Sequence, residues 1–498
     1  MSAERPHAIV IGSGFGGLAA AIRLGARGYR VTVLEQLDAP GGRAYVFRQD
    51  GFIFDAGPTI ITAPFLLEEL WALCDRRFSD DVELRALRPF YKIRFDDGST
   101  LDCSDDSREM ERQINQFAPG EFAGYENFLR ASEAIFKVAF EQLAHMPFDS
   151  AGDMLRLLPQ LLRLRSFRSI YGLAASHVRN PKLRFALSFH PLFVGGNPFT
   201  TTSIYGLIAF LERRWGVHFA IGGTGSIIAG MAKLIEGQGG RIIYNAKVAV
   251  ITEIGRRATG VALADGRRMV SDIVVSNADS AVTYRDLVPR AARRRWTDNK
   301  LERAHYSMSL FVWYFGTSRQ YPDVPHHTIL VGPRYRELLE DIFERKVLAE
   351  DFSLYLHRPT ASDPTLAPAG CDAFYVLSPV PNLRGNTDWH AAGESYRRSI
   401  AKHLSNTVLP KLEECVITSR IMTPLDFRDR LSSPYGAAFG LAPSLSQSAW
   451  FRPHNRSEEM ENLFLVGAGT HPGAGLPGVL SSARVLDTVV PDANVFIR

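Results

Sequence analysis

Cysteine is scarce in this sequence, and the few that occur lie far apart. The four cysteines, Cys74, Cys103, Cys371 and Cys415, form no CxxC pair among 498 residues. A disulfide framework needs a denser set of thiols, and a cysteine zinc site needs closely spaced ones. We therefore predict no disulfide framework and no metal site, and the composition fits a reducing compartment.

Long apolar runs are also absent. The longest stretch without a charged residue covers residues 185–211, and Pro191, Pro198 and the pair Gly195-Gly196 interrupt it. A membrane-spanning helix does not normally carry so many helix breakers. The apolar run at the N-terminus, His7–Ile11, is too short for a secretory leader. The sequence predicts neither a membrane span nor a leader.

The sequence has little excess charge. Its formal net charge is +4 at pH 7, too small to indicate nucleic-acid binding. Paired acids occur at Asp80-Asp81, Asp96-Asp97 and Asp105-Asp106, but none begins the DDxxD pattern with which a prenyl-diphosphate enzyme would hold magnesium. These absences exclude a nucleic-acid partner and a diphosphate-binding metal centre.

The strongest positive signal is a strand, a glycine-rich turn, a helix and a second strand near the N-terminus. In this dinucleotide-binding pattern, Gly12 permits a tight turn, Gly14 lets the backbone approach a pyrophosphate, and Gly17 lets the helix pack closely on the strand. The start of the helix presents free N–H groups and a positive dipole end to the phosphates. Glu35 ends the second strand and can accept hydrogen bonds from ribose hydroxyls.

Three later stretches extend this pattern. Residues 39–43 supply a second glycine turn and Arg43, which can reach further along a long dinucleotide. Residues 222–251 contain a glycine turn, a helical segment and two strand-like segments, and residues 462–486 contain a strand, a glycine-rich turn and a helix. The nucleotide domain is therefore predicted to be discontinuous, although this pattern alone does not separate FAD from NAD.

At this point the sequence resembles a known family, the FAD-dependent, bacterial-type phytoene desaturases (carotenoid desaturases) of the flavin amine-oxidase-like superfamily. The resemblance covers nearly the whole chain. Its most specific segments are residues 41–44 (GGRA), 54–59 (FDAGPT), 188–198 (SFHPLFVGGNP), 450–455 (WFRPHN) and 467–478 (GAGTHPGAGLPG).

Together, the patterns and the resemblance predict an α/β fold with three parts. A Rossmann-type FAD-binding domain would comprise residues 1–88, 217–282 and 448–498. A substrate domain built on an antiparallel sheet, with a strand such as Ser309–Phe315, would comprise residues 89–125 and 283–447. Residues 126–216 would form a helical, membrane-facing cap.

The resemblance implies FAD as the redox cofactor and phytoene as the apolar substrate. Successive dehydrogenations, with hydride transfer to the flavin, would give lycopene or neurosporene, and oxygen or a membrane quinone would accept the electrons. By resemblance, Gly12, Gly14 and Gly17 would hold the pyrophosphate, Glu35 the adenosine ribose, and Arg43 the phosphates or ribityl chain. Val248 would meet the adenine through its backbone, and Gly469, Thr470 and Pro472 would lie near the ribityl chain and the flavin ring.

No catalytic residue is predicted. The carbon left after hydride loss is an allylic cation, so alignment, water exclusion and a weak base are sufficient. His471 and Asp149 are candidates for that base, but both residues fit a structural role better. His326-His327 has no third ligand at metal-binding spacing and is expected at the surface. The abundance of phenylalanine (Phe185, Phe189, Phe193, Phe199 and Phe210 among others) fits either a substrate tunnel or an ordinary core.

One segment has no acidic residue. Residues 154–211 contain seven basic side chains and no Asp or Glu, and their first part interleaves leucines with arginines. Such a segment can rest in a membrane interface with its arginines at the headgroups, or it can form a cap whose arginines face water. We favour the interface, and with it a peripheral location on the cytoplasmic side of a membrane.

Two other functions remain open. One is a different flavin oxidoreductase of the same superfamily, such as an amine or porphyrinogen oxidase or a carotenoid isomerase. The other is a non-enzymatic prenyl-binding protein, because the superfamily includes chaperones of lipidated GTPases. The intact set of Gly12, Gly14, Gly17 and Glu35 argues against this last class, which needs no working cofactor site.

Overall fold

The N-terminal pattern forms the centre of a five-stranded sheet in a computed structural model, which describes residues 5–496 without the side chains of residues 151, 153 and 155. The strand order is β19 (Leu463–Leu465), β13 (Ile273–Ser276), β1 (His7–Ile11), β2 (Arg30–Leu34) and β9 (Arg241–Ile243). Every neighbouring pair is parallel. The carboxyl ends of these strands therefore share one edge, where parallel sheets place their ligands.

Alternation along β1 explains how this sheet is covered. Ala8 and Val10 pack into the core beneath α1 (Phe15–Ala26), α9 (Thr224–Gly237) and α16 (Leu476–Val489). Ile9 and Ile11 point to the other face, into the core under the antiparallel strands β10 (Val248–Ile254), β11 (Arg257–Leu263) and β12 (Arg268–Val270). Because both faces of the sheet are buried, the side chains that β1 presents to each face are apolar from Ala8 to Ile11.

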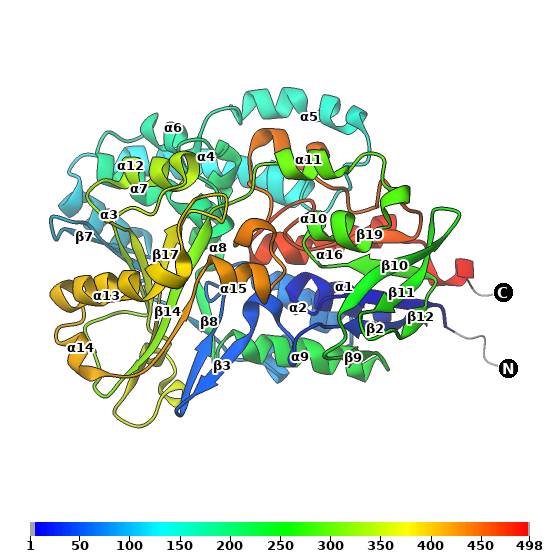
Figure 1. Cartoon of the computed structure of the whole chain (residues 1–498). Helices are drawn as coiled ribbons and strands as arrows, with labels where there is room; N and C mark the ends of the chain where they lie inside the picture. The colour runs from blue at the N-terminus through cyan, green and yellow to red at the C-terminus, as the bar shows by residue number, and fades with distance from the viewer. Residues whose placement is uncertain (1–4, 497–498) are drawn as a thin grey trace.

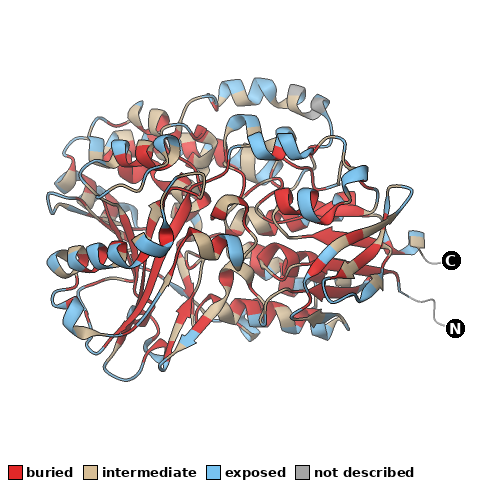
Figure 2. Ribbon diagram, in the orientation of Figure 1, coloured by how far each residue is buried: buried red, intermediate tan, exposed pale blue. Residues whose placement is uncertain are grey.

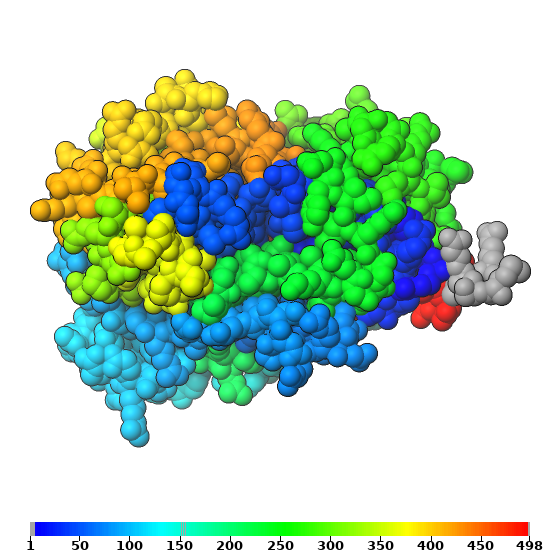
Figure 3. All heavy atoms as spheres, turned by 90° about the horizontal axis from the view of Figure 1, so that it is seen from below, coloured from blue at the N-terminus to red at the C-terminus, as the bar shows by residue number. Residues whose placement is uncertain are grey.

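Segments far apart in the sequence meet in this half of the molecule. Figure 3 shows the early chain in blue lying against the middle of the chain in green, and Figure 1 shows the C-terminal α16 in red beside α1. The nucleotide-type sheet is thus built from the beginning, the middle and the end of the chain.

A second, seven-stranded sheet forms the other half. Its order is β18 (Val416–Met422), β14 (Ser309–Thr317), β17 (Asp372–Val380), β16 (Leu354–His357), β15 (His327–Leu330), β6 (Tyr91–Arg94) and β7 (Thr100–Cys103). The predicted strand from Ser309 is present as β14. The sheet is mixed rather than purely antiparallel, because β15 pairs with β6 in parallel.

The two faces of β14 belong to different cores. Phe311, Trp313 and Phe315 pack towards α13 (Trp389–Thr407). Leu310 and Val312 belong to the larger core on the opposite face, together with the helical part of the chain. Leu310 and Val312 also line the cavity of the candidate site, which therefore lies along this second face of β14.

Residues 107–215 are largely helical. The elements are α3 (Ser107–Phe117), α4 (Phe122–Phe136), the π-helical turn η3 (Lys137–Gln142), α5 (Ala151–Arg163), α6 (Ile170–Ala175), α7 (Pro181–Ser188) and α8 (Leu207–Trp215). Figure 2 shows α5 at the upper edge of the molecule with much of its length exposed, whereas α7 and α8 lie nearer the buried interior. Among the described residues, no helix combines the length and the apolar character that crossing a membrane requires.

The remaining helices and strands connect these parts. They are β3 (Val46–Gln49), β4 (Phe52–Asp55), α2 (Phe65–Ala72), β5 (Leu84–Ala86), β8 (His218–Ala220), α10 (Ser280–Val282), α11 (Asp298–Arg303), α12 (Tyr335–Glu340), α14 (Leu412–Cys415) and α15 (Pro424–Asp429).

Candidate cofactor and substrate site

One cavity connects the nucleotide-type sheet to the second sheet. Its volume is about 830 Å³. At one end it is lined by the glycine turns at the carboxyl ends of β1 and β2, and at the other by apolar side chains of β14 and the helical part. A cavity of this size and character is typical of a cofactor and small-molecule site.

Six of the nine predicted cofactor residues line this cavity. They are Gly12, Gly14, Glu35, Arg43, Val248 and Pro472. Gly12 has a φ of 88°, in the left-handed region that favours glycine. Gly14 forms a backbone bridge with Gly41 of the second glycine turn, so the two turns lie side by side. Gly14 also caps α1 without a side chain, which leaves the first amides of the helix free towards the cavity.

The other three predicted residues lie behind the cavity wall. A Cβ atom on Gly17 would lie 2.0 Å from the carbonyl oxygen of Gly12. A Cβ atom on Gly469 would lie 2.5 Å from the Ser280 hydroxyl, and the Thr470 hydroxyl donates to the Pro453 carbonyl over 2.6 Å. These residues shape the turns rather than face a ligand.

The Glu35 carboxylate is held by two neighbours. Its Oε2 accepts from the Ser13 amide at 2.8 Å and from the Ser13 hydroxyl at 2.6 Å, and its Oε1 accepts from the Leu37 amide at 2.9 Å. Ser13 occupies a variable position of the glycine pattern, so the pattern gave no reason to assign it this role. The bonds fix the carboxylate at the end of β2, where a ribose hydroxyl would donate to it.

Arg43 places a cation without an anionic partner at the cavity wall. Its Nε donates to the Ala438 carbonyl at 2.7 Å and its guanidinium to the Ser433 hydroxyl at 3.0 Å. Among the described residues, no carboxylate lies within salt-bridge distance of it, and burial lowers its pKa although Asp279 partly opposes this effect. A buried cation normally has a partner, so Arg43 fits a negatively charged group in the cavity, as the phosphates of FAD would provide.

Arg452 and Asn455 have a structural role that no sequence pattern indicated. Arg452 is 1% exposed and donates to the carbonyls of Leu441 (3.1 Å) and Ala468 (2.8 Å). The Asn455 amide nitrogen donates to the His471 carbonyl at 3.1 Å. Both side chains therefore hold the 467–478 turn in place. Their position in the family-like segment 450–455 was the only sequence feature that marked them, and it did not indicate which groups they would bond.

Neither candidate base stands out. His471 is buried, and burial lowers its pKa to about 4. Its Nε2 lies 2.9 Å from the Leu143 carbonyl, a bond that ties the turn to the helical part. Asp149 is exposed and does not line the cavity.

The apolar end of the cavity is formed by helices and by β14. Of the five phenylalanines named above, Phe193 lines it, whereas the other four pack in the surrounding cores. Of those five, only Phe193 therefore fits a substrate tunnel, although Phe140, Phe148, Phe427 and Phe439 also line the cavity. The remaining lining includes Leu192, Leu207, Ile208, Leu211, Leu310 and Val312, together with Met154, Leu157 and Leu161 of α5.

A few polar groups interrupt this apolar lining. The Thr59 hydroxyl lies 2.5 Å from the Tyr375 hydroxyl and 3.2 Å from that of Tyr355. Glu212 also lines the cavity, and its carboxylate accepts from the Tyr91 hydroxyl at 2.7 Å.

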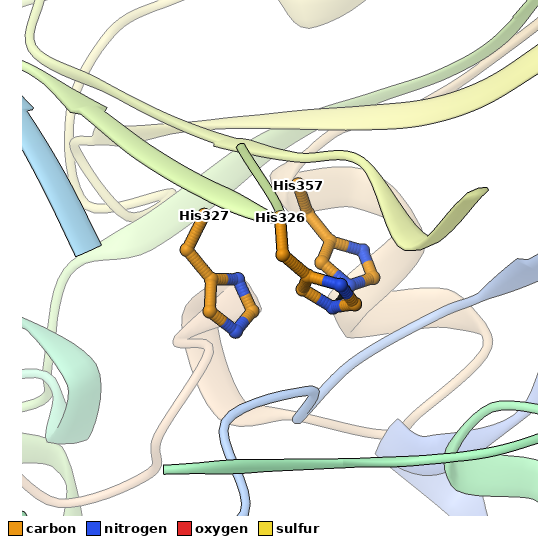
Figure 4. Close-up of side chains that lie close together, drawn as sticks. All are labelled: His326, His327 and His357. Carbon is orange, nitrogen blue, oxygen red and sulfur yellow. Dashed lines mark hydrogen bonds between the residues drawn. The ribbon is translucent and has the colours of Figure 1, made fainter. Parts of the chain in front are cut away.

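His326 and His327 are buried, so the expectation that they lie at the surface was wrong. Because β15 and β16 are register partners, His327 stands opposite His357, which the spacing along the sequence concealed. One ring nitrogen from each of the three lies within 4.8 Å of the others, and Figure 4 shows the rings gathered in one place. Burial lowers all three pKa values, that of His326 to about 3.

This spacing is compatible with a metal ion, but the electrostatics do not favour one. The partners of the ring nitrogens among the described residues are Ser362, Tyr355 and the histidines themselves. No carboxylate is among them, and the Arg358 cation already lowers the pKa of His326. An added divalent cation would therefore be buried without charge compensation.

The sequence is similar to known desaturases over its full length. It is 50% identical over 497 residues to the neurosporene-forming phytoene desaturase of Cereibacter sphaeroides, covering 99% of this chain and 96% of that protein. It is also 50% identical over 476 residues to the lycopene-forming phytoene desaturase of Pantoea ananas, covering 95% of this chain and 97% of that protein.

Solved structures show the same fold at low identity. Putrescine oxidase bound to putrescine superposes with a TM-score of 0.63 at 13% identity, covering 98% of this chain and all of that one. An oxidoreductase from Methanosarcina mazei gives a TM-score of 0.62 at 18% identity, covering 97% of this chain and all of that one. Residues 15–485 match the flavin containing amine oxidoreductase family. The chain belongs to that family and, within it, to the phytoene desaturases.

Proposed function

We propose that this chain is an FAD-dependent desaturase that dehydrogenates phytoene to lycopene or neurosporene. The observation that carries this proposal is the single cavity that joins the glycine turns and Arg43 to a long apolar lining. An amine oxidase would need polar or anionic groups for a charged substrate. The far end of this cavity is mainly apolar, and the Glu212 carboxylate there is already bonded to Tyr91 and His190.

FAD, when bound, supplies the hydride acceptor. The residues of the chain bind the cofactor, align the substrate and exclude water. The glycine turns and the start of α1 hold the phosphates, Glu35 orients the ribose, and Arg43 neutralises negative charge. Aliphatic side chains align the polyene and exclude water from the reacting carbons.

The number of dehydrogenations is open, because relatives of equal identity form different products. The test is incubation of the FAD-loaded protein with phytoene in liposomes, with oxygen or a quinone as the proposed electron acceptor. Each new conjugated double bond moves the absorption maximum to longer wavelength, so the spectrum identifies the product. Absence of any conjugated product with either acceptor would contradict the proposal.

We further propose that α5 rests in the membrane interface and passes substrate to the cavity. Met154, Leu157 and Leu161 line the cavity, whereas Leu158 and Leu162 face outwards with exposures of 48% and 56%. The helix is thus apolar on two sides, and only one of them is covered by protein. Large apolar side chains left in water indicate a contact surface.

Neighbouring residues extend this surface. Phe167, beyond the end of α5, is 65% exposed, and Phe451 of the short turn η13 (Ala449–Phe451), which contacts α5, is 46% exposed. Arg156, Arg163 and Arg165 are exposed, and none forms an ion pair with a described acidic residue. In contrast, residues 183–203 lie mostly in the core. We therefore assign the interface to α5 and the turn after it rather than to all of 154–211, on the cytoplasmic side of the membrane.

Changing Arg156, Arg163, Arg165 and Arg168 to Gln should weaken binding to anionic liposomes by at least about tenfold, because each basic side chain near such a surface contributes roughly 1 kcal/mol. Flotation at low and high salt measures the effect. The matched control changes Arg267, Arg268, Arg290 and Arg303, which lie outside this surface, and removes the same charge. Equal binding by the two variants would contradict the assignment to α5.

A further inference from the structure

A chain of buried polar groups leads from the cavity towards the surface. It begins at Thr59, which lines the cavity two residues after Gly57. A Cβ atom on Gly57 would lie 2.0 Å from the Arg43 carbonyl oxygen, so Thr59 lies close to the cofactor end of the cavity. The first polar groups of the chain are therefore near the place where cofactor and substrate would meet.

The next members lie on the adjacent strands β15 and β16. The Tyr355 hydroxyl lies 3.2 Å from the Thr59 hydroxyl and 2.7 Å from Nδ1 of His327. The Nε2 of His327 has no partner among the described residues, although the residue is fully buried. This nitrogen is free to pass a proton onwards.

The remaining members reach the edge of the fold. His357 Nε2 and His326 Nε2 lie 3.0 Å apart, and His326 Nδ1 lies 2.7 Å from the Ser362 hydroxyl. One nitrogen of His327 lies within 4.8 Å of both (Figure 4), a gap that one water molecule can span. Ser362 is next to the exposed Ala361, and its carbonyl accepts from the exposed Arg85.

We propose that these groups form a proton exit path, in which Tyr355 takes the substrate proton and His327, His357, His326 and Ser362 carry it to the surface. This inference rests on the proposed function. Dehydrogenation removes a hydride, which the flavin accepts, and a proton from the adjacent carbon. The electron pair of that second C–H bond becomes the new C=C bond. As its proton reaches the Tyr355 oxygen, the phenolic proton moves to Nδ1 of His327.

The acid–base properties of these groups suit such a path. Burial raises the pKa of Tyr355 well above its ordinary value, so the phenol stays neutral and can donate and accept at once. Burial lowers the pKa of His327 well below its ordinary value. A weak base is sufficient for a proton next to an allylic cation, and a weakly basic imidazole releases that proton readily to the next group.

The sharpest test compares Tyr355→Phe with Tyr396→Phe. Tyr355 lines the cavity and contacts a nitrogen of His327, whereas Tyr396 of α13 is equally buried, bonds only the Ser378 hydroxyl at 2.8 Å and lies outside the cavity lining. We expect Tyr355→Phe to lower kcat for phytoene at least about tenfold with KM, FAD content and thermal midpoint unchanged. Tyr396→Phe should stay within about threefold of the wild type. Similar losses in both variants would overturn the proposal.

A second measurement does not depend on turnover. In protein labelled with ¹⁵N-histidine, Nδ1 of His327 should be unprotonated and hydrogen-bonded, and its signal should shift in Tyr355→Phe. A protonated Nδ1 would overturn the path, because it could not accept the phenolic proton. If wild-type protein and Tyr396→Phe are both inactive on phytoene, the proposed function fails instead.

Discussion

A Gly17→Ala variant is expected to purify without bound flavin. The new Cβ atom would lie 2.0 Å from the Gly12 carbonyl oxygen, and a backbone atom cannot rotate away as a side chain can. Helix α1 would have to move away from β1, which would displace Gly14 and the free amides at the start of the helix. Overpacking of this kind costs about 1–3 kcal/mol, so we expect FAD affinity to fall by roughly 10- to 100-fold.

Flavin absorbance per mole of protein and titration of the apoprotein with FAD both measure this effect. Gly237→Ala provides the matched control, since Gly237 ends helix α9 and a Cβ atom there meets nothing within 4 Å. The control should bind FAD like the wild type. Wild-type flavin content in Gly17→Ala would show that the close contact between helix and strand is unnecessary for cofactor binding.

The second large effect expected is a loss of stability in acid. The pKa of His326 lies near 3 in the folded protein and that of His471 near 4, both below the ordinary value because of burial. Below about pH 6.5 the unfolded chain therefore binds protons that the folded chain does not, and stability falls as the pH decreases. At pH 4.5 each such histidine costs on the order of 2 kcal/mol.

Buried acids oppose this trend, among them Asp55 and Asp279, because burial raises their pKa values. Burial raises the pKa of Asp55 to about 6, so the folded protein takes up a proton there between about pH 6 and 4 while the unfolded chain does not. That uptake stabilises the fold as the pH falls. Three histidines in one cluster and His471 have lowered pKa values, so we expect the destabilising effect to be the larger one.

Urea unfolding from pH 7.5 to 4.5 in excess FAD measures the slope. His326→Gln should flatten it, because one of the protons taken up on unfolding is removed. His305→Gln, at an exposed position, is the control and should keep the wild-type slope. If the free energy of unfolding depends on pH equally in His326→Gln and the wild type, His326 is protonated equally in the folded and the unfolded protein.

The parts of the site that follow from local backbone geometry could be predicted from the sequence. Gly12 adopts a positive φ, and α1 begins with bare amides at Gly14, so the glycine spacing by itself predicted the turn and the start of the helix, and the phosphate site assigned to them stays a prediction. Strand β14 was predictable from its apolar residues. The separated glycine turns predicted that the sheet that carries them is built from distant stretches of the chain.

Features that depend on strand pairing or on the direction of one side chain were not predictable. His357 stands 30 positions after His327 and meets it only through the β15–β16 register. Arg452 bonds to carbonyls from two other segments, a pattern that has no sequence period. The basic segment was predicted as one surface, but most of residues 183–203 are packed in the core, whereas much of α5 and the turn after it is exposed.

The discontinuous parallel sheet also sets the order in which the protein can be completed. Strand β19 pairs with β13, and α16 packs on α1, so the last part of the chain completes the half that holds the glycine turns. During synthesis, residues emerge from the N-terminus onwards. The helix α5 and its exposed apolar side chains therefore leave the ribosome long before the cofactor cradle can close. FAD loading thus becomes a late event that follows the emergence of residues 463–489, and the membrane contact proposed for α5 would precede it.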